Sequence, residues 1–265
     1  MMQKETLAQQ EYVARQVRRR QMVTAARIMI LVMILLLWEV SARTGVINDF
    51  IFSSPSRMAL TFLSMAADRS IFYHTGITIL ETLASFAIVV AGGIAGAVLL
   101  WSSKTLAEIL DPYFVMLNSL PKSALAPILI VWLGANTRTI IVAAISVAVF
   151  GSILTLHNGF SNMDQDQVKL IYSLGGKRRD VLFKVLLPGS VPMIVSNMKV
   201  NVGLCLVGVI IGEFLAARAG LGYLIIYGSQ VFKLDLVMMS IVILCVLSAA
   251  LYKGIEMAES KINRN

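Results

Sequence analysis

The sequence predicts an all-α polytopic membrane protein with six transmembrane helices. Hydrophobic residues make up 57% of its 265 residues, and charged residues make up only 14%. A soluble domain contains about 45–50% apolar and about 25% charged residues. The apolar residues also gather in runs that reach the roughly 17 to 25 residues needed to cross a bilayer. Composition and run length therefore both indicate an integral membrane protein.

The net charge of +8 has the distribution expected of a membrane protein. Lys and Arg cluster at the ends of apolar runs, which is typical of membrane topology and favours lipid, not nucleic acid, as the surroundings. Cys205 and Cys245 both fall inside apolar runs. Two such cysteines provide neither a disulfide framework nor a metal site.

The chain begins with a polar, basic segment over residues 1–23, and the apolar run 25–42 predicts the first span. Val40-Ser41-Ala42 also fits the cleavage site of a secretory signal peptide. The length of the basic lead and of the apolar run favours an uncleaved span. Residues 43–74 predict an interfacial connector with a short surface helix, because Ser54-Pro55 is a helix-start signal.

The third span is predicted to be broken or bent. Residues Asn118, Ser119, Pro121, Lys122 and Pro127 interrupt it. Irregular backbone is tolerated at membrane depth only where protein or a water-filled cavity satisfies it. A transmembrane domain over 24–256 thus precedes a tail over 257–265, and the spans after the first are predicted at 75–101, 106–133, 137–157, 189–212 and 236–252.

Six spans place both termini on one side of the membrane. Fifteen Lys and Arg residues fall on the side of the termini, and six fall on the other side. Basic residues are enriched in cytoplasmic loops. We therefore expect cytoplasmic termini, together with a cytoplasmic location for the polar segment 164–188.

The 164–188 segment predicts two short amphipathic helices. Asp164 or Asp166 can cap the first helix, and Gly175-Gly176 supplies a left-handed stop. The second helix is predicted from Lys177 to Leu187, with Pro188 ending it. The segment is interpreted either as a solvated loop between two spans or as a compact surface on which another protein docks.

The sequence lacks the usual signs of an active site. It has no Gly-rich phosphate loop followed by Lys-Ser or Lys-Thr, so we do not expect the chain itself to bind ATP in the P-loop manner. His74 and His157 are far apart, and no His, Cys or carboxylate cluster accompanies them. We expect no catalytic residues, no metal and no cofactor bound by this chain.

Gly175 and the run Val185-Leu186-Leu187-Pro188 are separated by nine residues. This spacing resembles the cytoplasmic signature of the inner-membrane permease subunits of binding-protein-dependent ABC importers, most closely the nitrate/sulfonate/taurine type. The signature begins with an acidic-Ala-Ala triplet, whereas Lys169-Leu170-Ile171 stands here. Similar marks extend over nearly the whole chain: Trp38-Glu39, Ser54-Pro55-Ser56, His74-x-x-x-Thr78, Asp111-Pro112, Leu120-Pro121, Ala126-Pro127, Trp132-Leu133-Gly134, Gly212-Glu213-Phe214 and Gly220-Leu221-Gly222-Tyr223.

The resemblance implies a type I importer permease fold in the inner membrane that works by alternating access. It also implies a second permease copy in a homodimer, an extracytoplasmic solute-binding protein, and a cytoplasmic ATPase dimer that carries ATP and magnesium. It leaves the solute open among nitrate, alkanesulfonates, taurine, pyrimidines and flavins. The base at Lys169 implies a charge pair with the ATPase that differs from the usual one. The residues implied in coupling are Lys169, Leu170, Ile171, Leu174, Gly175, Gly176, Lys177, Arg178, Arg179 and Pro188.

Polar residues at predicted membrane depth are candidates for the translocation path. An ionised group costs about 2.5–3.5 kcal/mol there, so such residues usually face a cavity or a partner. Alternatively, Lys199 pairs with Glu81 or with helix-end carbonyls, and Lys122 extends to an interface. For Glu213, gating, pairing and marking the interface remain open. The path candidates are Asn118, Lys122, Lys199, Asn201 and Glu213.

Two other classes of function compete with the importer permease. A self-contained secondary transporter or channel would couple transport through intramembrane titratable groups and would need no docking segment. The absence of an inverted repeat and the spacing of the 164–188 segment argue against it. The other alternative is a membrane scaffold that transports nothing.

Overall fold

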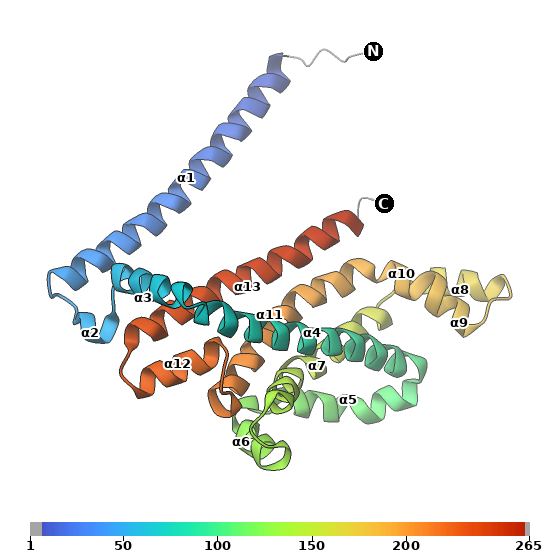
Figure 1. Cartoon of the computed structure of the whole chain (residues 1–265). Coiled ribbons are helices and arrows are strands. Elements are labelled where there is room, and N and C mark those ends of the chain that lie inside the picture. The colour runs from blue at the N-terminus through green and yellow to red at the C-terminus, as the bar shows by residue number, and fades with distance from the viewer. Residues whose placement is uncertain (1–6, 263–265) are drawn as a thin grey trace.

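The computed structural model describes residues 7–262, which form α-helices without a strand (Figure 1). Five helices in this range are long and apolar enough to cross a membrane, and α5 with α6 forms a sixth candidate that bends by 94°. The helices are α1 Leu7–Arg43, α2 Asp49–Phe52, α3 Pro55–Ala67, α4 Ser70–Ser102, α5 Lys104–Ser119, α6 Lys122–Leu133, α7 Thr137–Ser161, α8 Gln165–Ser173, α9 Arg178–Val181, the π-helix η1 Leu182–Leu186, α10 Leu187–Gly189, α11 Val191–Ala216, α12 Leu221–Gln230 and α13 Leu234–Ile262.

Helix α7 packs against both α4 and α11. Small residues allow these helices to approach closely, as is common between membrane helices. A Cβ atom built on Gly208 of α11 would lie only 2.5 Å from the Cα atom of Ala144 in α7, and one on Gly212 would lie 2.9 Å from the Cα atom of Ile140. The backbones of α7 and α11 are therefore in near contact along this side.

Polar contacts identify the two ends of the bundle. At one end, the Arg178 guanidinium donates to the Trp101 carbonyl at the end of α4 (2.6 Å), and Lys199 of α11 pairs with Glu259 of α13. At the other end, Arg57 of α3 pairs with Asp235 at the start of α13 (2.9 Å). The 164–188 segment therefore lies far from α2, α3 and α12, as Figure 1 shows.

The connector predicted before the second span contains α3. Ser54 caps this helix by accepting from the Arg57 N–H (3.4 Å), and Pro55 occupies its first position, as the sequence predicted. Met58 is buried in the core cluster that includes Met239 of α13. The helix thus has a packed face as well as the expected exposed one.

The third span is broken between α5 and α6. Leu120 is extended (φ −63°, ψ 137°), which is the conformation that a following proline imposes. Lys122 donates to the Leu117 carbonyl and so satisfies one open group at the end of α5. Pro127 lies inside α6, so the predicted interruption is confined to Leu120-Pro121.

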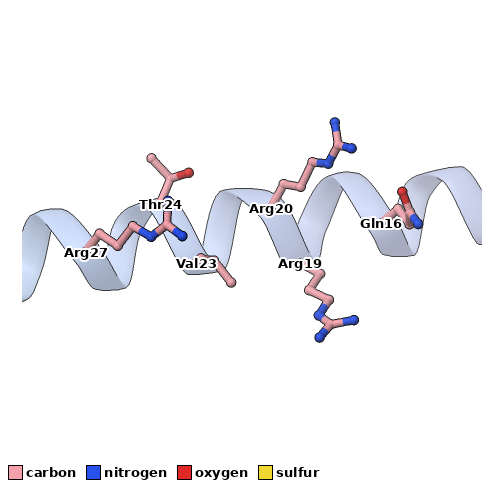
Figure 2. Close-up of a pocket in the computed structure, with 6 residues that line it drawn as sticks. All are labelled: Gln16, Arg19, Arg20, Val23, Thr24 and Arg27. Atoms are coloured by element: carbon pink, nitrogen blue, oxygen red, sulfur yellow. The ribbon is translucent and has the colours of Figure 1, made fainter. Parts of the chain in front are cut away.

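Helix α1 is longer than the predicted first span, since it begins at Leu7 instead of near residue 25. Its N-terminal half is rich in Gln, Arg and Ala, which are good helix formers. In Figure 2, Arg19 and Arg20 point to different sides of this half of the helix. The basic charge is therefore spread around α1. Residues 1–6 of the predicted N-terminal segment and 263–265 of the predicted tail lie outside the described residues.

Pro188 does not end the second helix of the 164–188 segment, contrary to the prediction. Helix α9 continues through η1 into α10, which contains Pro188, and α11 follows after Ser190. The Leu187 N–H donates to the Leu182 carbonyl, five residues back. This wider turn accommodates a residue that lacks an N–H and whose ring would clash with the carbonyl four residues earlier in a regular helix.

We expect Gly208→Ala to lower the stability of the isolated chain by about 1–3 kcal/mol, because the added methyl group would force α7 and α11 apart. The measurement is thermal unfolding in detergent. Gly203→Ala on the same helix is the control, since nothing lies within 4 Å of a Cβ atom built there. Equal melting temperatures for the two variants would show that the close contact does not limit stability.

Candidate functional site

The first half of the 164–188 segment is a short helix with a defined end. Asp164 caps α8 by accepting from the Asp166 N–H (2.9 Å). At the other end, the Gly175 N–H donates to the Tyr172 carbonyl (3.0 Å) and the Gly176 N–H donates to the Ile171 carbonyl (2.9 Å). Gly175 has φ +80°, which residues with a Cβ atom rarely adopt. The predicted glycine stop is therefore present, and it fixes the direction of the chain.

The second half begins with a carboxylate cap. The Lys177 N–H donates to Asp180 (2.8 Å), and Lys184 pairs with the same carboxylate (3.0 Å). The hydrogen bond from the Lys177 N–H, which has the larger effect, and the contact with Lys184 hold the pKa of Asp180 below its ordinary value. Because the folded-state pKa is lowered, this stabilisation is present near neutral pH and is lost as the pH falls through the folded-state pKa.

Large apolar side chains are exposed on this segment. Leu170 is 58% exposed, Leu174 is 76% exposed, and Phe183 is 65% exposed. Leu170 and Leu174 belong to the capped helix α8 and its end, and Phe183 lies in η1, which follows α9. Figure 1 shows α8 and α9 at one end of the bundle. Large exposed apolar side chains on a protruding element are typical of sites that contact another protein or a membrane.

The basic residues of the segment have different surroundings. Arg178 donates to Trp101 and stacks on its ring at 4.9 Å, so it anchors the segment to α4. Lys169 pairs with Asp166 (3.0 Å) in an exposed contact, which contributes little to stability. Lys177 and Arg179 are exposed. Pro188 lies in α10, which leads into α11, apart from the exposed apolar side chains of α8.

A buried network at the opposite end of the bundle was not predicted. The Gly220 N–H donates to His74 Nδ1 (3.0 Å), the Leu221 N–H donates to Thr78 Oγ1 (2.8 Å), and the Gly222 N–H donates to Glu213 Oε2 (2.5 Å). The first N–H groups of a helix have no partners within it. We call His74, Thr78 and Glu213 the α12 clamp, because they supply these partners from α4 and α11.

The clamp is connected internally as well. Thr78 donates its hydroxyl proton to Glu213 Oε1 (2.7 Å), and Glu213 is completely buried. Gly220 has φ +118°, and a Cβ atom there would overlap the Glu213 carboxylate. The signal in the sequence was the spacing of His74 and Thr78, which places both on one helical face, but the identity of their partners requires the fold.

The five path candidates are not brought together. Asn118 is exposed at the end of α5, and Lys122 lies 5.4 Å from the centre of the Phe150 ring. Asn201 is 2% exposed and donates to Ser152 of α7 (3.0 Å). Lys199 forms an ion pair with Glu259. Lys199, Asn201 and Glu213 therefore make contacts between helices in this conformation, and the partner proposed for Lys199, Glu81, is replaced by Glu259 of α13.

We expect Thr78→Val to lower the free energy of unfolding by about 1–3 kcal/mol, since it removes the partner of the buried Leu221 N–H and the donor to Glu213 Oε1. Thermal unfolding of the purified chain measures the effect. Thr105→Val, at an exposed position of α5, is the matched control. A Thr78→Val protein as stable as the control would mean that the clamp does not hold α12.

Comparisons with known proteins relate this membrane protein to transport permeases. A family model described as "Binding-protein-dependent transport system inner membrane component" matches residues 88–256, more than half of the chain. A Haemophilus influenzae protein named "Probable ABC transporter permease protein" is 27% identical over 229 residues, which cover 86% of this chain and 93% of that protein. The taurine transport system permease protein TauC of Escherichia coli is 23% identical over 238 residues, which cover 88% and 86% of the two chains.

A solved structure shares the fold. One chain of the MetNI methionine ABC transporter, in an inward-facing conformation, matches with a TM-score of 0.60 and 19% identity over 75% of this chain and 94% of that chain. This likeness confirms the type I importer permease fold that the sequence resemblance implied. The relatives are transport permeases, which are not themselves enzymes. The chain therefore belongs to the family of binding-protein-dependent transport system inner membrane components, and it is a multi-pass transport permease.

Proposed function

We propose that this permease is the membrane-spanning subunit of an ATP-driven importer and that its 164–188 segment docks on a cytoplasmic ATPase dimer. The observation that carries the proposal is the exposure of Leu170, Leu174 and Phe183 on a segment held in a fixed shape. An apolar helix face of this kind suits a groove on a partner protein. The family's dependence on a binding protein supports the same assignment.

Charges around the apolar face favour an acidic rim on the ATPase. Lys177 and Arg179 are exposed and can meet such a rim, which would direct the approach of the two proteins. Lys169 already has Asp166 as a local partner. The base at this position can thus stand beside the docking surface without a reversed charge on the ATPase.

Movement of the docked segment would reach the transmembrane helices through packed contacts. Leu186 is buried in a cluster with Ala97 of α4 and with Leu156 and Phe160 of α7. Arg178 ties the same segment to the end of α4. Closure of the ATPase would therefore act on α4, α7 and α11 together, as alternating access requires.

The family to which the chain belongs supports the remaining partners of this proposal. A second copy of the permease would complete the membrane portion, and an extracytoplasmic binding protein would deliver the solute. ATP and magnesium would be bound by the ATPase, and this chain would bind no cofactor. We place both termini and the 164–188 segment in the cytoplasm and the protein in the cell (inner) membrane, because Lys and Arg are concentrated on that side.

We place the solute path at the break between α5 and α6. Asn118 and Lys122 lie there, where the backbone bends by 94°. Interrupted membrane helices commonly form solute sites. The relatives include permeases named for taurine and for formylaminopyrimidine, so small polar solutes are the class we propose. Lys199, Asn201 and Glu213 would join the path only if their present contacts open.

We expect Leu174→Glu to abolish co-purification of the proposed partner ATPase, because a carboxylate cannot be buried in an apolar groove. Leu174→Met, which keeps the residue apolar, is the matched control and should retain the ATPase. Leu174 is largely exposed, so neither change should affect insertion of the chain in the membrane. An ATPase that still binds the Leu174→Glu permease would sink the docking assignment.

A further inference from the structure

A cavity of about 530 Å³ lies between the transmembrane bundle and the 164–188 segment. It is formed where α4 turns into α5, beside the end of α7 and the helices α8 and α9. The function proposed above makes no use of it. The residues that line the cavity and that matter below are Trp101, Lys104, Glu108, His157, Tyr172 and Arg178.

The cavity contains more basic than acidic groups. Lys104 and Arg178 are its cations, and Glu108 is its one carboxylate. One nitrogen of Arg178 donates to the Trp101 carbonyl, which leaves the other N–H groups of the guanidinium free to donate. Among the described residues, Lys104 has neither an ion pair nor a side-chain hydrogen bond, so its ammonium group can meet an anion.

His157 also lines the cavity, but its Nδ1 does not face the open space. This atom is shielded from solvent and has no hydrogen-bond partner within residues 7–262. An atom that a water molecule does not reach is also out of reach of an anion's oxygen. The cations available to an anion in the cavity are therefore Lys104 and Arg178.

The rest of the lining is aromatic and apolar. Trp101 and Tyr172 belong to the residue types that gather at the headgroup level of membranes. Leu99 and Ile109 are exposed on the neighbouring turns of α4 and α5, and they would face the acyl chains of a lipid. A ligand with a charged head and apolar tails fits this arrangement better than a free ion.

We propose that the cavity binds the phosphate headgroup of an anionic phospholipid. The phosphate lies between Lys104 and Arg178. Basic pockets between membrane helices on the cytoplasmic side are suited to such headgroups. The bound lipid bridges the corner between α4 and α5 and the 164–188 segment, and it stabilises the position from which that segment projects.

Native mass spectrometry of the purified full chain tests this proposal without the ATPase, so its outcome is independent of docking. The chain is offered equal amounts of phosphatidylglycerol and phosphatidylcholine. We expect retention of phosphatidylglycerol, a decrease of about fivefold with Lys104→Ala, and an increase with Glu108→Gln, which removes the opposing charge. Lys253→Ala, at an exposed base of α13 that does not line the cavity, should retain as much lipid as the unaltered chain.

The opposite response of the two cavity variants separates a binding role from a general loss of fold. Equal retention of the two lipids, or unchanged retention of phosphatidylglycerol by both Lys104→Ala and Glu108→Gln, would overturn the proposal. Excess inorganic phosphate is added in a parallel sample. Complete displacement of the lipid by phosphate would assign the cavity to a free anion and would also overturn the lipid assignment.

Discussion

The close backbone contact of α7 with its neighbours is the constraint on which the rest of the structure depends. In a bilayer, lipid competes with side chains for apolar contact, so helices associate through close packing and polar contacts. Gly208 and Gly212 of α11 provide that closeness against Ala144 and Ile140 of α7. On the other side of α7, Gly93 of α4 meets Ser152, and the same serine contacts the buried amides of α11. The three helices therefore form one unit.

This unit connects two specialised ends. Helix α4 carries Thr78 of the α12 clamp near its start and contacts Arg178 through Trp101 at its end. Helix α11 carries Glu213 near its end, and it follows the 164–188 segment along the chain. A displacement of the segment would thus be transmitted by whole helices to the clamp. The physical basis is rigid-body packing, in which buried hydrogen bonds keep each helix in register with its neighbours.

The general fold could be predicted from the sequence, because it depends on local patterns. Apolar runs gave the spans, Ser54-Pro55 gave the start of α3, and Gly175 gave the stop of α8. Pro188 was misinterpreted because a proline ends a regular helix, whereas a π-turn admits it. Leu186 of this turn is buried against α4 and α7, and a local sequence pattern does not contain such contacts.

The contacts of the buried polar residues could not be predicted in the same way. The pairs formed by Lys199 with Glu259 and by Thr78 with Glu213 join residues that are far apart in the sequence. A charge at membrane depth indicates that a partner exists, but only the arrangement of helices identifies it. The exposed apolar face of α8 was predictable in kind, since Leu170 and Leu174 are four residues apart on one helical face.

The most direct test of the central claim is cysteine cross-linking of the 164–188 segment to the ATPase in the assembled transporter. Cys245 is first replaced by Ser, since it is exposed, and Cys205 is buried. Leu174→Cys should form a disulfide with cysteines placed along the ATPase groove, whereas Leu63→Cys, an exposed position on α3 at the other end of the bundle, should form none. Cross-linking from Leu63→Cys and none from Leu174→Cys would contradict the account.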